Sequence, residues 1–174
     1  PQIFFSEKKG TCNKIGTSFA REENPMHPTA SAIRETVEKA ATKLTAITPE
    51  AAREKPAPEE WCKQQILGHL IDSALNNHQR FVRGGYNAAI DFPPYRQETW
   101  VELQGYDERD WRELIDLWVM VNRHLCALLD RLPLEVFDNP CGIGHEKPVR
   151  LEFVMDDYLR HLNMHLGDIF NKPA

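Results

Sequence analysis

The chain of 174 residues is long enough for one domain with a sizeable core, since 41% of its residues are hydrophobic and 27% are charged. Its formal charge of −5 argues against a nucleic-acid surface, which needs a concentrated patch of Lys and Arg. The sequence contains no apolar run near the roughly 20 residues of a membrane span, and its first residues lack an apolar signal region. We therefore expect a cytoplasmic protein that binds neither nucleic acid nor membrane.

Residues 1–25 show no sustained hydrophobic periodicity, and we expect them to form an N-terminal extension. Met26 stands just before the first helical pattern and is a candidate natural start, which would make the extension an upstream segment. A docking arm is the competing interpretation. Residues 26–174 are expected to form one domain.

Four amphipathic segments follow, each with apolar residues at helical spacing. Thr48-Pro49 is expected to end the first segment, and Gly84-Gly85 the second. Pro58 suits the first turn of the second segment, and Pro133 stops the third. The four helices are predicted over about residues 29–47, 58–84, 111–132 and 151–169.

Strand signals are scarce, although residues 139–149 could hold a short hairpin. The sequence therefore predicts an all-α four-helix bundle. The connection from Gly84 to Tyr106 is too long to join neighbouring antiparallel helices, so we expect it to cross over the bundle. Its many aromatic residues could roof a cleft, or they could serve packing alone.

His161 and His165 are the most informative residues of the last helix. Four positions apart, they project from one face a turn apart, so both imidazoles can reach one metal ion. They lie along the edge of the apolar stripe, where a helix meets its neighbours. Two surface or packing histidines would show the same spacing, so the pair needs a third ligand to indicate a metal site.

His69, in the second helix, is the candidate third ligand. It shares a polar face with Asp72, Asn76 and Arg80, and this face is either solvent surface or the lining of a wet cleft. By periodicity His78 is the more buried histidine of this helix. A lone histidine in an apolar stripe is, however, more often a satisfied core residue than a ligand.

Three motifs in order resemble the DinB family over roughly residues 29–170. They are the run WCKQQILGHLIDSA at 61–74, the loop YRQETWV at 95–101 and the run DYLRHLNMHL at 157–166. The resemblance implies a four-helix bundle with a long crossover and one divalent metal ion, nickel or zinc, held by three histidines. The family's ligand positions match His69, His161 and His165, which leaves His78 to packing or to support of the site.

The same resemblance implies hydrolysis, thiol transfer or thiol-dependent isomerisation. Three neutral histidines leave the ion's charge to activate water or a small thiol. Asp72, Asp157 and Asp168 stand at helical spacing from the ligands and are candidate supporting partners, although a solvated helix charge is the simpler explanation of each. Asn76 and Arg80 are candidate contacts of a small substrate, anionic or thiol-bearing.

Two other functions remain open. The same bundle could be a non-catalytic protein that binds a metal or a small molecule, or a purely structural bundle in which the histidines are incidental. The presence of all three histidines favours an enzyme, a metal-dependent hydrolase or thiol transferase. A homodimer is compatible with the sequence.

Overall fold

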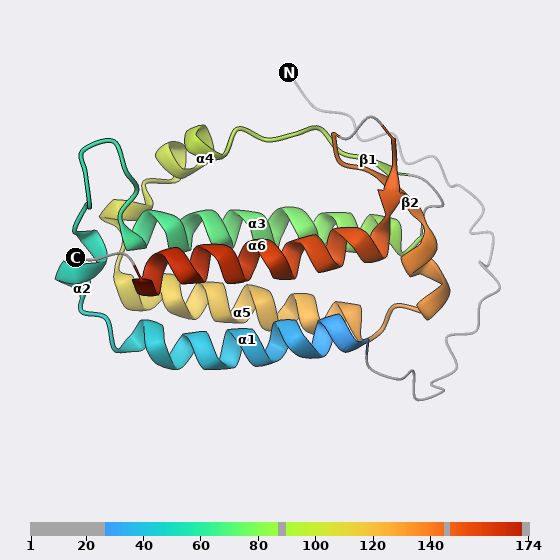
Figure 1. The fold of residues 1–174 in the computed structure, drawn as a ribbon, viewed down its shortest axis with the longest axis horizontal. Helices are drawn as coiled ribbons and strands as arrows, with labels where there is room; N and C mark the ends of the chain where they lie inside the picture. Colours follow the sequence, from blue (N-terminus) through green and yellow to red (C-terminus); the bar gives the residue numbers. More distant parts are fainter. Residues whose placement is uncertain (1–26, 87–89, 145–146, 172–174) are drawn as a thin grey trace, which may run out of the picture.

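The computed structural model describes residues 27–86, 90–144 and 147–171, so the expected extension of residues 1–25 and the candidate start Met26 lie outside the described residues. Four long helices pack into a bundle, which confirms the predicted all-α four-helix architecture (Figure 1). They are α1 (Pro28–Thr45), α3 (Lys63–Gly84), α5 (Trp111–Leu129) and α6 (Leu151–Asn171). Two shorter helices, α2 (Pro49–Arg53) and α4 (Gln97–Gln104), lie outside the bundle.

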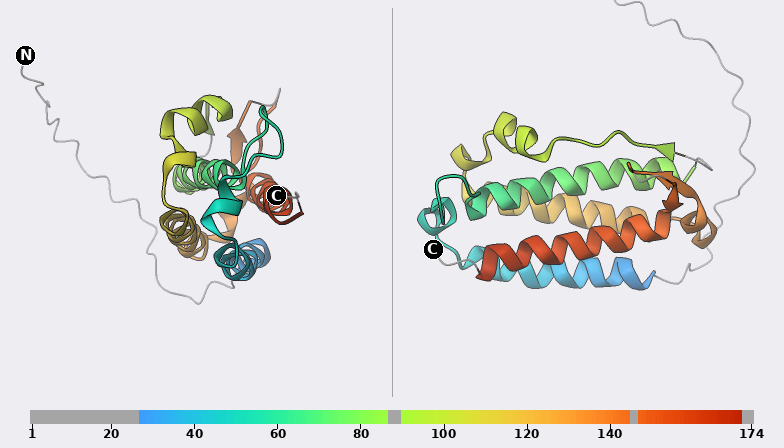
Figure 2. Two further views of the ribbon diagram at one scale, coloured as in Figure 1. Left: turned by 90° about the vertical axis from the view of Figure 1, so that its left-hand side faces the viewer. Right: turned by 45° about the horizontal axis from the view of Figure 1, so that its top comes forward.

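The long helices occupy the corners of a square in an order that differs from their order in the chain. Both α1 and α3 pack against α5 and α6, so α1 and α3 stand at opposite corners (Figure 2). α3 and α5 are neighbours that run in the same direction (Figure 1). Two parallel neighbours can be joined only by a segment that returns along the bundle, and this confirms the expected crossover between residues 84 and 106.

The crossover carries structure of its own. It contains β1 (Ile90–Asp91), α4 and a short 3-10 helix, η1 (Tyr106–Glu108). β1 pairs in parallel with β2 (Pro140–Gly142), which pairs antiparallel with β3 (Val149–Arg150). β2 and β3 match the short hairpin predicted over residues 139–149, and the 3-10 helix η2 (Leu134–Asp138) precedes them. The pairing of β1 with this hairpin and the helix α4 were not predicted.

Two helix boundaries differ from the prediction. The first helix, α1, already ends at Thr45, and Thr48-Pro49 begins a further helix, α2. The Thr48 hydroxyl caps α2 by accepting a hydrogen bond from the amide of Ala51 (3.3 Å). α3 begins at Lys63 rather than near Pro58. The side chain of Gln65 accepts a hydrogen bond from the backbone N–H of Cys62 (3.2 Å), which fixes the first turn there.

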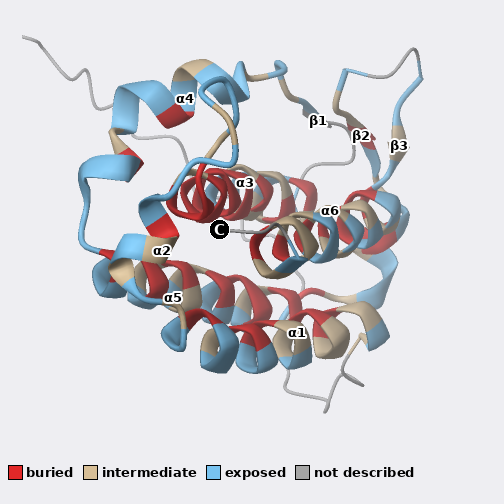
Figure 3. Cartoon of the chain, turned by 60° about the vertical axis from the view of Figure 1, so that its left-hand side comes forward, coloured by how far each residue is buried: buried red, intermediate tan, exposed pale blue. Residues whose placement is uncertain are grey.

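The core lies where the apolar stripes of the four long helices meet, as the inward-facing buried residues in Figure 3 show. Its largest side chains include Trp111, Trp118, Phe81 and Tyr158. The indole N–H of Trp111 donates to the carbonyl of Ile47 (3.1 Å), which ties α5 to the end of α1. Within the described ranges, every helix is too short or too polar to cross a lipid bilayer.

Candidate metal centre

Three histidines meet where α3 faces α6. His69 projects from α3, and His161 and His165 project from successive turns of α6, as their spacing predicted. The Nε2 atoms of His69 and His161 lie 3.1 Å apart. The ring of His165 lies 4.9 Å from that of His69 and 4.5 Å from that of His161, between ring centroids. The structure thus brings all three predicted ligands together.

The separation of these nitrogens suits a shared divalent ion. One nitrogen from each ring lies within 4.8 Å of the others. On a tetrahedral zinc ion with bonds of about 2.0–2.1 Å, two nitrogen ligands are about 3.3 Å apart. The 3.1 Å distance between His69 and His161 is close to that value. Three protein ligands leave one position of such an ion for water or substrate.

The imidazoles of His69 and His161 are in the neutral form that binds metals. Burial, followed by the neighbouring rings of His161 and His165, lowers the pKa of His69 to about 4. Burial and the ring of His165 lower the pKa of His161 to about 4 as well. Both rings therefore carry no charge at neutral pH, and each has a lone pair to offer an ion.

Hydrogen bonds orient the two candidate ligands on α6. The Nδ1 atom of His165 lies 3.0 Å from a carboxylate oxygen of Asp168, so the ring N–H donates to Asp168 and the Nε2 lone pair is left for a metal. The Nδ1 atom of His161 lies 3.4 Å from the hydroxyl of Ser73 on α3. Asp168 was a predicted partner, whereas Ser73 was not.

His69 is held differently from the other two histidines. It is almost fully buried, with 1% of its surface exposed, and its Nδ1 atom has no hydrogen-bond partner among the described residues. Its ring packs against the indole of Trp61 at 5.4 Å between centroids. On its Nδ1 side, packing against Trp61 rather than a hydrogen bond therefore holds this imidazole.

Other elements cover the polar face of α3. This face is therefore not solvent surface, which was one of the two interpretations of the sequence. Asp72 is fully buried, and its carboxylate accepts hydrogen bonds from Gln104 at the end of α4 and from the hydroxyl of Tyr106 (2.8 Å). Gly68 permits this cover, because a Cβ atom at Gly68 would lie 2.1 Å from the Tyr106 ring. Asp72 thus fastens the crossover onto α3 one turn from His69.

The remaining candidates lie further from the histidines. Asn76 donates to the backbone carbonyl of Asp72 (2.8 Å). Arg80 is about 16 Å along the helix axis from His69 at 1.5 Å per residue. Its guanidinium packs on Phe92 at 5.8 Å from the ring centroid, and it also donates to Asn77 (3.2 Å). This placement separates Arg80 from the imidazoles.

Asp157 and His78 complete the predicted set. Asp157 pairs with Arg160 on the surface of α6, with 2.6 Å between oxygen and nitrogen, and its charge raises the pKa of His161 against the larger effect of burial. The expectation that His78 is more buried than His69 is wrong. His78 is only half-buried and stacks on His124 of α5, while α4, η1 and α6 close over His69.

Tyr106 belongs to the aromatic crossover that was expected to pack on the bundle or roof a cleft. The sequence did not single out four other residues that shape the site, namely Trp61, Ser73, Glu98 and Gln104. The charge of Glu98, on α4, raises the pKa of His69, a smaller effect than the lowering by burial and by the neighbouring histidines. Ser73 shares the polar face of His69, which was the available signal for it. The others lie in non-periodic segments, whose position over α3 depends on tertiary contacts.

Comparisons with known proteins place this arrangement in a wider group. The sequence profile of the DinB superfamily matches residues 31–169. The fold is similar to that of YfiT from Bacillus subtilis, described as a probable metal-dependent hydrolase with an unusual four-helix bundle topology, with a TM-score of 0.74, 21% identity and 82% of each chain covered.

A second solved structure is that of a mycothiol-dependent maleylpyruvate isomerase, with a TM-score of 0.70 and 11% identity. The match covers 88% of the present chain and 63% of the isomerase chain. The comparison with curated proteins gave no match. At these identities the two solved structures establish a shared fold.

Proposed function

The chain belongs to the DinB superfamily, and from this premise we propose that it is a metal-dependent enzyme that activates water or a small thiol. The observation that carries the proposal is the convergence of three imidazoles from two helices, with 3.1 Å between the nearest ring nitrogens. One structural neighbour is described as a probable metal-dependent hydrolase and the other depends on the thiol mycothiol. Both descriptions support small-molecule chemistry of this kind.

In this proposal His69, His161 and His165 hold one divalent ion, and a set of three nitrogen ligands suits zinc or nickel. When bound, the ion supplies Lewis-acid chemistry that acidifies a water molecule or a thiol. Asp168 keeps the proton of His165 on Nδ1 and so keeps Nε2 free as a donor atom. The Ser73 hydroxyl, 3.4 Å from Nδ1 of His161, can donate or accept a hydrogen bond, so it is compatible with the same tautomer of His161 without enforcing it.

The choice between an enzyme and a non-catalytic binding protein depends on what reaches the open side of the centre. A sealed ion with a fourth protein ligand would be structural. In the described residues, only the three histidines form a cluster with metal-binding geometry, and no Cys, Asp or Glu joins them as a fourth member. An open position favours catalysis over a structural role.

Metal analysis followed by substrate screening tests the proposal. Tag-free protein should contain about one divalent ion per chain, and the metal-loaded form should hydrolyse small esters or amides or transfer a small thiol, while metal-free protein should not. Protein that remains metal-free when offered zinc and nickel contradicts the metal centre. A loaded protein that turns over neither substrate class would instead be the binding protein.

A further inference from the structure

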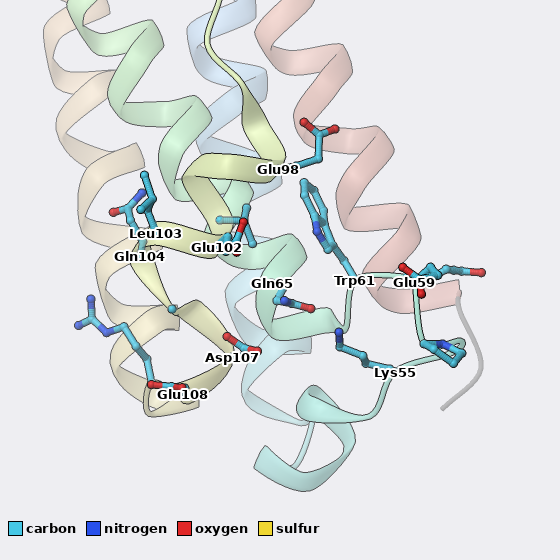
Figure 4. A pocket seen from close by; sticks show the side chains of 15 residues that line it. Lys55, Glu59, Trp61, Gln65, Glu98, Glu102, Leu103, Gln104, Asp107 and Glu108 are labelled. Atoms are coloured by element: carbon cyan, nitrogen blue, oxygen red, sulfur yellow. The ribbon is translucent and has the colours of Figure 1, made fainter.

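A pocket of about 1090 Å³ lies between α4–η1 and the segment that joins α2 to α3 (Figure 4). None of the three histidines lines it. One wall is the indole of Trp61, which packs against the ring of His69 at 5.4 Å between centroids. The pocket is therefore separated from a metal ligand by a single side chain.

The pocket is strongly acidic. Lys55 and Arg109 are its two cationic side chains, and the guanidinium of Arg109 lies 4.0 Å from the carboxylate of Glu113 outside the pocket. Six carboxylates line the same space: Glu59, Glu60, Glu98, Glu102, Asp107 and Glu108. A concave surface with one predominant sign of charge concentrates ions of the opposite sign and repels those of its own.

Trp61 joins the pocket to the histidines through its contact with His69. Figure 4 shows the Trp61 indole and the Glu98 carboxylate beside each other on one side of the pocket. An indole face next to carboxylates is the combination that attracts an organic cation, through the ring quadrupole and through charge.

We propose that this pocket is the substrate site and that it selects a small organic cation, an amine or a quaternary ammonium compound. The charged group lies against Trp61 and the carboxylates of Glu98 and Glu102, and the reacting group extends toward the histidines. This inference rests on the proposed function, because it assigns the pocket to the substrate of the same centre. It differs from the expectation of an anionic substrate beside Arg80, which lies on another part of α3.

Three probes of nearly equal shape test the selection by charge: choline, its neutral analogue 3,3-dimethylbutan-1-ol, and the anion 3,3-dimethylbutanoate. Binding to the full chain, both zinc-loaded and metal-free, is measured by ligand-observed NMR titration. Choline should bind at least about tenfold more tightly than the alcohol, and more weakly as salt is added. The anion should bind more weakly than the alcohol.

Variants then locate the binding. The double change Glu98→Gln and Glu102→Gln should weaken choline about tenfold without changing the affinity for the alcohol, because only the charge is removed. Trp61→Leu should weaken choline several-fold through loss of the indole face. Glu135→Gln, at the exposed start of η2, is the matched control and should change neither affinity.

The outcomes separate the pocket from the metal centre. Equal affinities for the three probes, tighter binding of the anion, or no choline binding in either metal state would overturn the cation pocket. Choline binding that the double glutamine variant retains would overturn it too. None of these results bears on the metal content of the wild-type protein. Conversely, choline binding that persists in metal-free protein supports the pocket even where metal-dependent turnover fails.

Discussion

Two histidines of α3 each contact histidines of another long helix, and only one of these two groups has the geometry of a metal site. His69 meets His161 and His165 of α6, while His78 stacks on His124 of α5. The distances between ring centroids are similar, 4.9 Å for His69 with His165 and 4.9 Å for His78 with His124. Proximity of imidazoles therefore does not distinguish the groups.

The surroundings of the rings make the difference. Asp168 and Ser73 lie within hydrogen-bond distance of His165 and His161, and α4 and η1 cover the face of α3 that carries His69. The rings of His78 and His124 stack nearly face to face, with 29° between their planes, and His124 is exposed. A metal site needs edge nitrogens that point at a common centre, which stacked rings do not provide.

Removal of one ligand should have the largest effect. His161→Ala is expected to weaken zinc or nickel binding by more than about 100-fold, because two histidines remain where three converged. His78→Ala should leave metal affinity within about twofold of wild type. Metal content and competition with a chromogenic chelator measure both, and equal losses in the two variants would contradict the assignment of ligands.

The pH dependence of the free energy of unfolding should also distinguish His161 from His78. Since the pKa of His69 and of His161 is about 4, below the ordinary value of about 6.5, the unfolded chain binds more protons between these values. Metal-free protein should therefore lose stability as the pH falls, on the order of 2 kcal/mol for each of these two histidines by about pH 5.

Urea unfolding across that interval measures this slope. His161→Ala should flatten it, because one imidazole with a lowered pKa is removed and its repulsion on His69 is lost. His78→Ala should retain most of the slope, although burial and His124 lower the pKa of His78 too. The same slope in wild type and in His161→Ala would show that the cluster does not titrate as described.

A third test concerns the cover over His69. Gly68→Ala would place a Cβ atom 2.1 Å from the ring of Tyr106, and we expect a loss of about 1–3 kcal/mol as the crossover shifts. Gly167→Ala on α6 is the matched control, because its Cβ would meet nothing nearer than 3.8 Å. That control should gain up to about 1 kcal/mol from helix propensity. The denaturant midpoints of the two variants, measured without metal, test these changes. A Gly68→Ala midpoint equal to that of wild type would contradict the close contact with Tyr106.

The smallest effect is expected at the orienting carboxylate. Asp168→Asn should weaken metal binding about tenfold, since the amide orients the His165 ring less strongly than the carboxylate does. Asp157→Asn, whose carboxylate pairs with Arg160 on the surface, should change the affinity less than about threefold. Affinities that rank in the reverse order would remove Asp168 from the site.

The regular helices were predictable because each long helix buries a stripe with helical period, and the pair on α6 follows from spacing alone. Spacing alone did not identify His69 as a candidate ligand. The period placed it on a polar face and favoured His78 as the buried histidine, and only the likeness to a known family singled out His69. The cover that buries His69 comes from Gln104 and Tyr106, more than 30 positions along the chain.

The helix α4 and the acidic pocket illustrate the same limit. α4 has eight residues and one buried side chain, Val101, so its hydrophobic pattern is too short to stand out. Trp61 and Glu98 come from separate segments that meet only after the crossover has folded onto α3. Charge composition did not predict the acidic pocket, because the overall charge of −5 does not indicate where carboxylates gather.

The position of the ligands in the chain also orders events during folding. His69 and His161 are 92 positions apart, and α4, η1 and α5 are made between them. Long-range contacts of this kind form late, after the local helices. A nascent chain that has completed α3 contains only His69 of the three candidate ligands and cannot bind an ion tightly. Metal acquisition would thus report that α6 has docked, and the ion would be loaded onto a nearly finished bundle rather than guide its assembly.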